Sequence, residues 1–293
     1  INILYKINKL FTHLKWLYHH SLVKENILHC FIRYFWLHLT KRNGSIFSFT
    51  LLGQKISVRK GHGSQTNYFT FLEDYNDMLF ALHYMSKDDL FVDIGSNIGI
   101  YSILVSGVKK SKVKAIEPMK NNYEMLIGNI DSNNLSDTVT PINIAIGKEN
   151  TELNYSYEGA LSKPAKEKNM GEMVEVRKLD KIIKYADLIK IDVEGYELDV
   201  LSGATKVLEN NKTNALIVEM IPNQPNETYK VDVYNILKNN GFRPYKYHPI
   251  NRSFELLTSK NISLPNTIFL RNLNLTLLKI KSSSPIKIGK KYY

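Results

Sequence analysis

From about residue 88 onward, short runs rich in β-branched residues alternate with stretches of helical periodicity. Such alternation predicts a mostly parallel sheet with helices on both faces, because consecutive parallel strands are joined by crossover helices. The predicted strands are residues 90–94, 112–117, 138–146, 188–193, 215–220, 242–247 and 267–271. The predicted helices are residues 98–108, 120–130, 198–208 and 229–239. The fold class that follows is α/β, with a doubly wound, Rossmann-like sheet.

Composition divides the chain into three parts. We expect a basic, helical N-terminal segment at residues 1–45, the α/β domain at residues 46–275 and a basic C-terminal tail at residues 276–293. Within the domain, residues 158–172 are polar and contain two glycines and a proline, which predicts a long loop or lid.

The net charge of +11 is concentrated at the two ends of the chain. Residues 1–60 carry ten basic side chains against the single acid Glu25, and residues 271–293 carry six basic side chains and no acid. Basic ends attract anionic lipid head groups, acidic glycans or nucleic acid. Two interpretations of the N-terminal segment stay open: a helical cap packed on the domain, or a basic amphipathic segment on an anionic membrane surface.

A short strand pair marks the start of the α/β domain, and the cysteine content indicates the cellular compartment. Residues 46–52 and 55–60 read as two strands around the turn residue Gly53. The only cysteine, Cys30, excludes an intrachain disulfide and fits a reducing compartment. We therefore expect a cytoplasmic protein, at the inner face of a membrane if the membrane interpretation holds.

A buried strand that ends in Asp93 leads into a glycine-containing turn and then a helix. Glycine lets the backbone approach a ligand closely, and the start of the helix offers free N–H groups. The dinucleotide-binding fingerprint needs glycine at the third and sixth positions counted from Gly95, where this chain has Asn97 and Ile100. The turn therefore predicts a ligand without phosphates, bound partly through a carboxylate such as Asp93.

Acidic residues end the neighbouring predicted strands. Glu117 ends the second strand, where a carboxylate can accept both hydroxyls of a ribose. Asp192 and Glu194 follow a later buried strand, and Glu219 ends the next one. Ligands of open α/β sheets bind outside the carboxyl ends of the strands, so all four carboxylates are aimed at one crevice. Glu197 is better explained as a carboxylate that satisfies free N–H groups at a helix start.

These motifs resemble the FkbM-type methyltransferases in order and spacing. The matching stretches are residues 93–99, Glu117-Pro118, Asn143-Ile144-Ala145, Leu179-Asp180 and residues 190–197 (KIDVEGYE). The resemblance covers roughly residues 68–271, and its last motif is the most specific. It implies a class I methyltransferase fold with seven strands, the last of them antiparallel.

The resemblance also implies a cofactor and the residues that hold it. The turn with Asp93, Gly95, Asn97 and Gly99 would bind the methionine part of S-adenosylmethionine. Glu117 would hold the ribose. By the same resemblance, the strand end with Asn143 and Ala145 would lie near the adenine.

Members of this family commonly methylate hydroxyl groups of sugars or other natural products, which implies a sugar, glycan or glycolipid acceptor of the kind used in polysaccharide biosynthesis. An alcohol is a weak nucleophile, so a general base should assist. The candidates are Asp192 and Glu194, followed by Glu219 and His248. The same carboxylates would suit Mg²⁺, which is the less favoured alternative.

Two other classes of function compete with this hypothesis. A nucleic-acid methyltransferase would suit the net charge, but no nucleic-acid-binding signature accompanies it, and residues 61–270 are slightly acidic. A module that binds the cofactor without catalysis, docked on a membrane as a scaffold, would suit the basic ends. The full set of strand-end acids argues against that scaffold.

Overall fold

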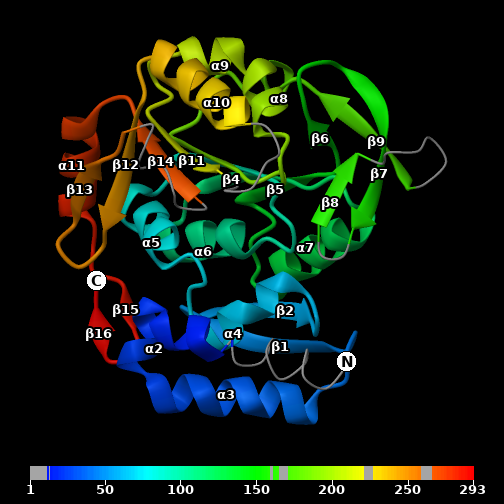
Figure 1. Cartoon of the computed structure of the whole chain (residues 1–293), viewed down its shortest axis with the longest axis vertical. Helices are drawn as coiled ribbons and strands as arrows, with labels where there is room; N and C mark the ends of the chain where they lie inside the picture. Colours follow the sequence, from blue (N-terminus) through cyan, green and yellow to red (C-terminus); the bar gives the residue numbers. More distant parts are fainter. Residues whose placement is uncertain (1–11, 13, 159–160, 165–170, 221–226, 259–265) are drawn as a thin grey trace.

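The computed structural model describes residues 12, 14–158, 161–164, 171–220, 227–258 and 266–293, and its centre is an eight-stranded sheet (Figure 1). In spatial order the strands are β13 (Ser253–Leu256), β12 (Arg243–His248), β14 (Asn266–Leu270), β11 (Ala215–Glu219), β10 (Leu188–Ile191), β3 (Leu90–Ile94), β4 (Lys112–Ile116) and β5 (Val139–Ile142). All seven predicted strand regions contribute to this sheet, which confirms the predicted alternation.

Strand direction follows the pattern that the family resemblance implies. Strands β5, β4, β3, β10 and β11 are parallel, and β14 is antiparallel to both of its neighbours, β11 and β12. The expected antiparallel last strand is therefore confirmed. The sheet has eight strands rather than seven, because β13 forms a hairpin with β12 in which Phe254 lies opposite Tyr247. The rings of Phe254 and Tyr247 lie 5.0 Å apart, so an aromatic contact holds this short edge strand.

Helices cover both faces of the sheet, as Figure 1 shows. One layer contains α5 (Tyr75–Tyr84), α6 (Ile100–Lys109) and α7 (Lys120–Ser132), and the other contains α8 (Glu197–Ser202), α9 (Thr205–Glu209) and α10 (Glu227–Asn239). Neighbouring residues of one strand point to opposite layers: Phe91 packs in one apolar cluster and Val92 in the other. Strands buried on both faces explain the continuous apolar runs of the sequence. Helix α11 (Leu273–Ser282) packs beside α5.

A second, four-stranded sheet is inserted between β5 and β10. Its strands, in spatial order, are β6 (Ala145–Ile146), β9 (Glu172–Arg177), β7 (Thr151–Glu158) and β8 (Leu161–Pro164), and the short helix η2 (Leu179–Lys181) follows. The expected loop at residues 158–172 is thus partly wrong, because β8 pairs with β7 within it. Residues 159–160 and 165–170 of that stretch lie outside the described residues.

The described part of the N-terminal segment is mostly helical up to Thr40. Residues 14–19 are helical, followed by α2 (Ser21–Glu25) and α3 (Ile27–Thr40). The predicted strand pair is confirmed as a hairpin of β1 (Ile46–Leu51) and β2 (Gln54–Arg59). Its two turn residues, Leu52 and Gly53, both have positive φ, as a two-residue type I′ turn requires. The short helices η1 (Gly63–Gln65) and α4 (Thr66–Thr70) lead to the domain.

The C-terminal residues pack against the described part of the N-terminal segment. After α11, a small hairpin of β15 (Lys287–Ile288) and β16 (Lys291–Tyr292) meets the N-terminal segment, where Lys291 Nζ lies 2.7 Å from Glu25 Oε1. Tyr293 is buried in the same apolar cluster as Leu17 and Leu22. None of the helices that the structure describes is long and apolar enough to cross a bilayer.

Candidate active site

The predicted site residues gather around one pocket of about 270 Å³ at the carboxyl ends of β3, β4, β10 and β11. Those that line it are Asp93, Gly95, Asn97, Glu117, Ala145, Asp192, Glu194 and Glu219. Gly99 and Asn143 do not line it. The strand ends therefore bring together residues that lie up to 126 positions apart in the sequence.

The turn after β3 explains why glycine is required there. Gly95 has a φ of +78°, and a Cβ on it would lie 1.9 Å from the main-chain oxygen of Asp192. The turn thus passes directly against the end of β10. Gly99 has a φ of +87° at the start of α6, and a Cβ there would meet Leu126 of α7 at 2.4 Å. Gly95 therefore shapes the pocket wall, whereas Gly99 permits helix packing behind it.

Asp93 is the second-last residue of β3, and its carboxyl group is buried. Ser102 Oγ donates a hydrogen bond of 2.7 Å to Asp93 Oδ2, while Asp93 Oδ1 has no hydrogen-bond partner among the described residues. Burial raises the pKa of Asp93, and the Lys190 ammonium opposes that rise. Ser96 Oγ in the same turn is also buried without a partner there. Buried polar atoms without partners are rare, so this turn is suited to a polar ligand.

Glu117 is held by the same turn. Its Oε2 accepts a hydrogen bond of 2.9 Å from the Asn97 N–H, and its Oε1 accepts one of 3.0 Å from the Met119 N–H. Burial raises the pKa of Glu117 to about 7 despite these bonds. Asn143 Nδ2 donates to the main-chain oxygens of Glu117 and Pro118 at 2.8 Å. Asn143 thus fixes the backbone that carries Glu117, from behind the pocket.

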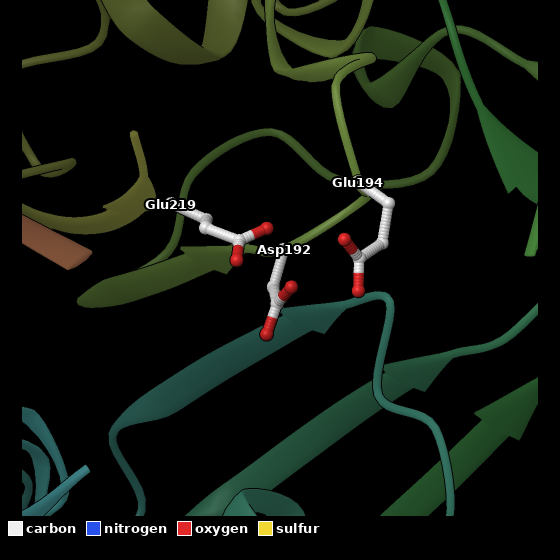
Figure 2. A group of neighbouring side chains, drawn as sticks. All are labelled: Asp192, Glu194 and Glu219. Atoms are coloured by element: carbon white, nitrogen blue, oxygen red, sulfur yellow. The ribbon is translucent and has the colours of Figure 1, made fainter. Parts of the chain in front are cut away.

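Asp192, Glu194 and Glu219 form a carboxylate cluster (Figure 2). One oxygen from each lies within 4.8 Å of the others. Burial raises the pKa of Glu219 to about 10, and the negative charges of Asp192 and Glu194 add to the rise. Glu219 therefore carries a proton at neutral pH.

Lys190 provides the positive charge of this cluster. It lies in the middle of the apolar strand β10 and is almost fully buried, with Nζ 2.6 Å from Asp192 Oδ2 and 4.8 Å from the ring centre of Tyr101. Although burial acts to raise the pKa of Asp192, this ammonium group lowers it overall, so Asp192 stays ionised. The three carboxylates have the spacing of a metal site, but Lys190 already supplies a cation to Asp192.

The structure adds two acids that motif analysis missed. Glu73 and Asp74 precede α5 and line the same pocket. Burial raises the pKa of Glu73 to about 7, and the charges of Asp74 and Asp192 contribute. Asn67 of α4 holds Glu73 through its side-chain amide, with Nδ2 3.2 Å from Oε2. No sequence signal marks these residues, because only the packing of α4 and α5 brings them to the strand ends.

The catalytic candidate His248 and the structural acid Glu197 both fall outside the pocket lining. His248 lies at the end of β12, partly exposed and 3.2 Å from Glu255, and does not line the pocket. Glu197 Oε1 accepts hydrogen bonds from the N–H groups of Gly195 and Val193 at the start of α8. The expected structural role of Glu197 is confirmed.

A glycine turn after the first strand, an acid at the end of the second and an antiparallel last strand define the class I methyltransferases, which use S-adenosylmethionine. Residues 93–244, more than half of the chain, match the sequence model of the methyltransferase FkbM domain. The chain therefore belongs to the FkbM methyltransferase family.

Two curated relatives are methyltransferases. The chain is 30% identical over 147 residues to hexuronic acid methyltransferase AglP of Haloferax volcanii, a match that covers 46% of this chain and 56% of that protein. It is 25% identical over 175 residues to methyltransferase sdnD of Sordaria araneosa, covering 46% of this chain and 68% of that protein. The chain thus spans little more than half the length of the first relative.

Solved structures with a similar fold include P. horikoshii TYW2 in complex with MeSAdo, at 15% identity and a TM-score of 0.43, covering 84% of this chain and 83% of that one. Another is the M. jannaschii tRNA m1G37 methyltransferase, at 13% identity and a TM-score of 0.45, covering 79% of this chain and 58% of that one.

The pKa of Glu117 leads to a pH-dependent prediction. With the ribose at Glu117, as the family resemblance implies, protonation of its carboxyl group below about pH 7 would leave a poorer acceptor for the ribose hydroxyls. We expect the affinity for S-adenosylmethionine to fall by about tenfold from pH 8 to pH 6. Calorimetric titration at several pH values measures this, and Glu117→Gln should flatten the profile. A wild-type profile that is already flat over this range contradicts the prediction.

The raised pKa of Glu117 also makes the stability of the protein without cofactor depend on pH, and this stability changes with pH in the opposite direction to the affinity. The folded pKa of about 7 lies above the unfolded value of 4.5, so the folded state holds the extra proton between these values. The contribution of Glu117 to stability is therefore full below pH 4.5 and is lost as the pH rises through 7.

Proposed function

We propose that this chain transfers the methyl group of S-adenosylmethionine to a hydroxyl group of a sugar or glycan. The observation that carries the proposal is the carboxylate cluster of Asp192, Glu194 and Glu219, which lies beside the glycine turn in one pocket. The relative named a hexuronic acid methyltransferase supports a sugar acceptor.

The residues of the pocket fit this cofactor. The backbone at Gly95 allows close approach, and Glu117 offers a carboxylate toward the pocket. Asp93 Oδ1 and Ser96 Oγ offer buried polar atoms without partners among the described residues. When bound, S-adenosylmethionine supplies an activated methyl group, and the protein supplies orientation and proton transfer.

The chemistry of the cluster follows from its charges. Asp192 is ionised beside Lys190, whereas Glu219 is protonated, so the carboxylate cluster already holds one proton. The acceptor hydroxyl would give its proton to an oxygen of Asp192 or Glu194 as its own oxygen takes the methyl group. The sulfur–methyl bond would break in the same displacement, with neutral S-adenosylhomocysteine as the leaving group. Such general-base assistance accelerates a reaction by about 10²- to 10⁴-fold. Lys190 is the positioning residue that holds the Asp192 carboxylate in place.

The charge of the pocket narrows the acceptor class. Its described lining contains the carboxyl groups of Glu73, Asp74, Asp93, Glu117, Asp192, Glu194 and Glu219, against one cationic side chain, that of Lys190. Even with Glu219 protonated and Asp192 paired with Lys190, carboxyl groups outnumber cationic groups in this lining, so an anionic acceptor would meet net repulsion. We therefore propose a neutral or amino sugar rather than a hexuronate as the acceptor.

Transfer of a labelled methyl group to a panel of acceptors tests the proposal. We expect base-stable label, as an ether gives, on neutral hexosides or hexosaminides, with kcat/KM at least about tenfold above that on hexuronides. A chelator should leave the rate unchanged, because Lys190 supplies the cation of the cluster. Label only on RNA, base-labile label only on carboxyl groups, or loss of activity with the chelator would each overturn the corresponding part of the proposal.

A further inference from the structure

Helix α3 presents a stripe of large apolar side chains to solvent. Leu28, Ile32 and Leu39 are 73%, 59% and 82% exposed, and Phe35 and Trp36 on the same face are also exposed. Their spacing of four, three, one and three residues follows one face of a helix. In Figure 1 this helix lies along the outer edge of the molecule, on the opposite side of the domain from α9 and α10.

The inner face of α3 is apolar too, and it holds the helix rigidly on the protein. Cys30, Tyr34 and Leu37 are buried against the domain. Arg33 Nη1 donates a hydrogen bond of 2.9 Å to the main-chain oxygen of Tyr68. A helix that is apolar on both faces is normally covered on both. The solvent face of α3 therefore needs an occupant, since contiguous apolar patches of this kind mark interaction sites.

The charges around the stripe indicate which occupant. Lys24 precedes α3, and Lys41 and Arg42 follow it, so basic groups flank the apolar stripe at both ends. The one acid in the first sixty residues, Glu25, is bound by Lys291 and by the Tyr293 hydroxyl. No acidic side chain of this segment is thus left to repel an anionic surface.

The aromatic residues match the same environment. Both tryptophans of the chain, Trp16 and Trp36, lie in the N-terminal segment and are partly exposed, and Tyr18, two positions after Trp16, is exposed. Tryptophan and tyrosine favour the boundary between lipid tails and water. Lys41 Nζ lies 5.1 Å from the ring centre of Trp36, so a cationic group already accompanies an aromatic ring at the end of the helix.

We infer that the outer face of α3 docks on the surface of a membrane that contains anionic lipids. The helix lies in the plane of the interface, with its apolar stripe in the lipid and the flanking lysines and arginine among the head groups. Docking requires no change in the fold, because the inner face already anchors the helix.

Packing contacts connect the outer helix α3 to the pocket. Helix α3 packs against α4, and Asn67 of α4 both lines the pocket and holds Glu73. Docking would therefore keep the pocket close to the lipid surface. If the proposed function holds, a glycan acceptor carried on a membrane lipid suits this arrangement, but docking itself does not depend on the acceptor.

Tryptophan fluorescence gives a direct test, because Trp36 lies on the outer face of α3 and the one other tryptophan, Trp16, lies elsewhere in the N-terminal segment. The full chain is titrated with phosphatidylcholine vesicles and with vesicles that contain about one third phosphatidylglycerol. We expect a blue shift and co-flotation with the anionic vesicles only, weakened by salt as electrostatic attraction to lipid is. An unchanged spectrum and no co-flotation would overturn the inference.

A matched pair of variants distinguishes vesicle binding through the outer face of α3 from nonspecific binding through other exposed apolar residues. Leu39→Glu places a charge in the stripe, whereas Leu278→Glu makes the same change at a 70% exposed position of α11. We expect Leu39→Glu to weaken vesicle binding by at least about tenfold and Leu278→Glu to leave it unchanged, with both variants keeping the wild-type melting temperature. Equal effects of the two would contradict the inference. So would a lipid-independent dimer that Leu39→Glu dissociates, since it would assign the face to a second copy of the chain.

Discussion

At least one of the variants Asp192→Asn and Glu194→Gln is expected to lower kcat by about 10²- to 10⁴-fold while the affinity for S-adenosylmethionine changes little. The expected loss is the usual contribution of a general base, because the amide cannot take the proton of the acceptor hydroxyl. Affinity should survive because the predicted cofactor contacts lie with Asp93 and Glu117, on neighbouring strands. Single-turnover kinetics and calorimetric titration measure the two quantities separately.

The variants Asp192→Asn and Glu194→Gln differ in their effect on the ion pair between Lys190 and Asp192. Asp192→Asn removes the 2.6 Å ionic partner of the buried Lys190, so it should also lower stability, by about 3 kcal/mol. Glu194→Gln leaves that ion pair intact, so a loss of rate there reports chemistry more directly. Glu175→Gln, an exposed acid on β9, is the control and should behave as wild type. Full activity in both Asp192→Asn and Glu194→Gln would disprove the assignment of the base.

The sequence predicted the strand-end architecture well because its signals there are local. A buried strand, a glycine that must adopt positive φ and a carboxylate at a strand end each occupy a few consecutive residues. The parallel sheet then places those ends side by side, so Gly95, Glu117 and Asp192 could be assigned to one crevice without knowledge of side-chain packing.

Other parts of the site depend on contacts between distant segments. Glu73 and Asp74 reach the pocket only because α4 and α5 pack across the strand ends, and neither has a motif around it. Lys190 did carry a signal, since a lysine within the apolar run of β10 must be paired when buried, yet its partner became apparent only in the structure. Strand β13 has four residues, none of them fully buried, and therefore lacks the apolar pattern of the central strands.

The contacts between the two terminal regions were likewise not predictable from local sequence patterns. Charge alone marked residues 276–293 as a tail, whereas the structure forms a helix and a hairpin there that reach the N-terminal segment. The pair of Glu25 and Lys291 joins residues 266 positions apart, which no local pattern reveals. This pairing removes the one acid of the N-terminal segment from the α3 surface, and so contributes to its net basic character.

Glu117→Ala is expected to weaken binding of S-adenosylmethionine by at least about 100-fold. A hydrogen bond to a charged group contributes about 1.5–3 kcal/mol, and the two ribose hydroxyls would lose two of them. The substitution also leaves the N–H groups of Asn97 and Met119 without their acceptor, so the glycine turn loses an anchor. Both effects lower the affinity for S-adenosylmethionine, and calorimetric titration of the purified protein measures their sum.

Asn122→Ala is the matched control, because Asn122 Nδ2 contacts Glu117 Oε1 only weakly, at 3.4 Å, and would not contact the ribose. We expect it to cost no more than about tenfold in affinity, the share due to positioning alone. Unchanged binding in Glu117→Ala would move the cofactor away from β4, and no binding to the folded wild-type chain would remove the methyltransferase mechanism altogether. Strong loss with Glu117→Ala and slight loss with Asn122→Ala would instead support a role of this carboxylate in cofactor binding, through the ribose and through the turn that it anchors.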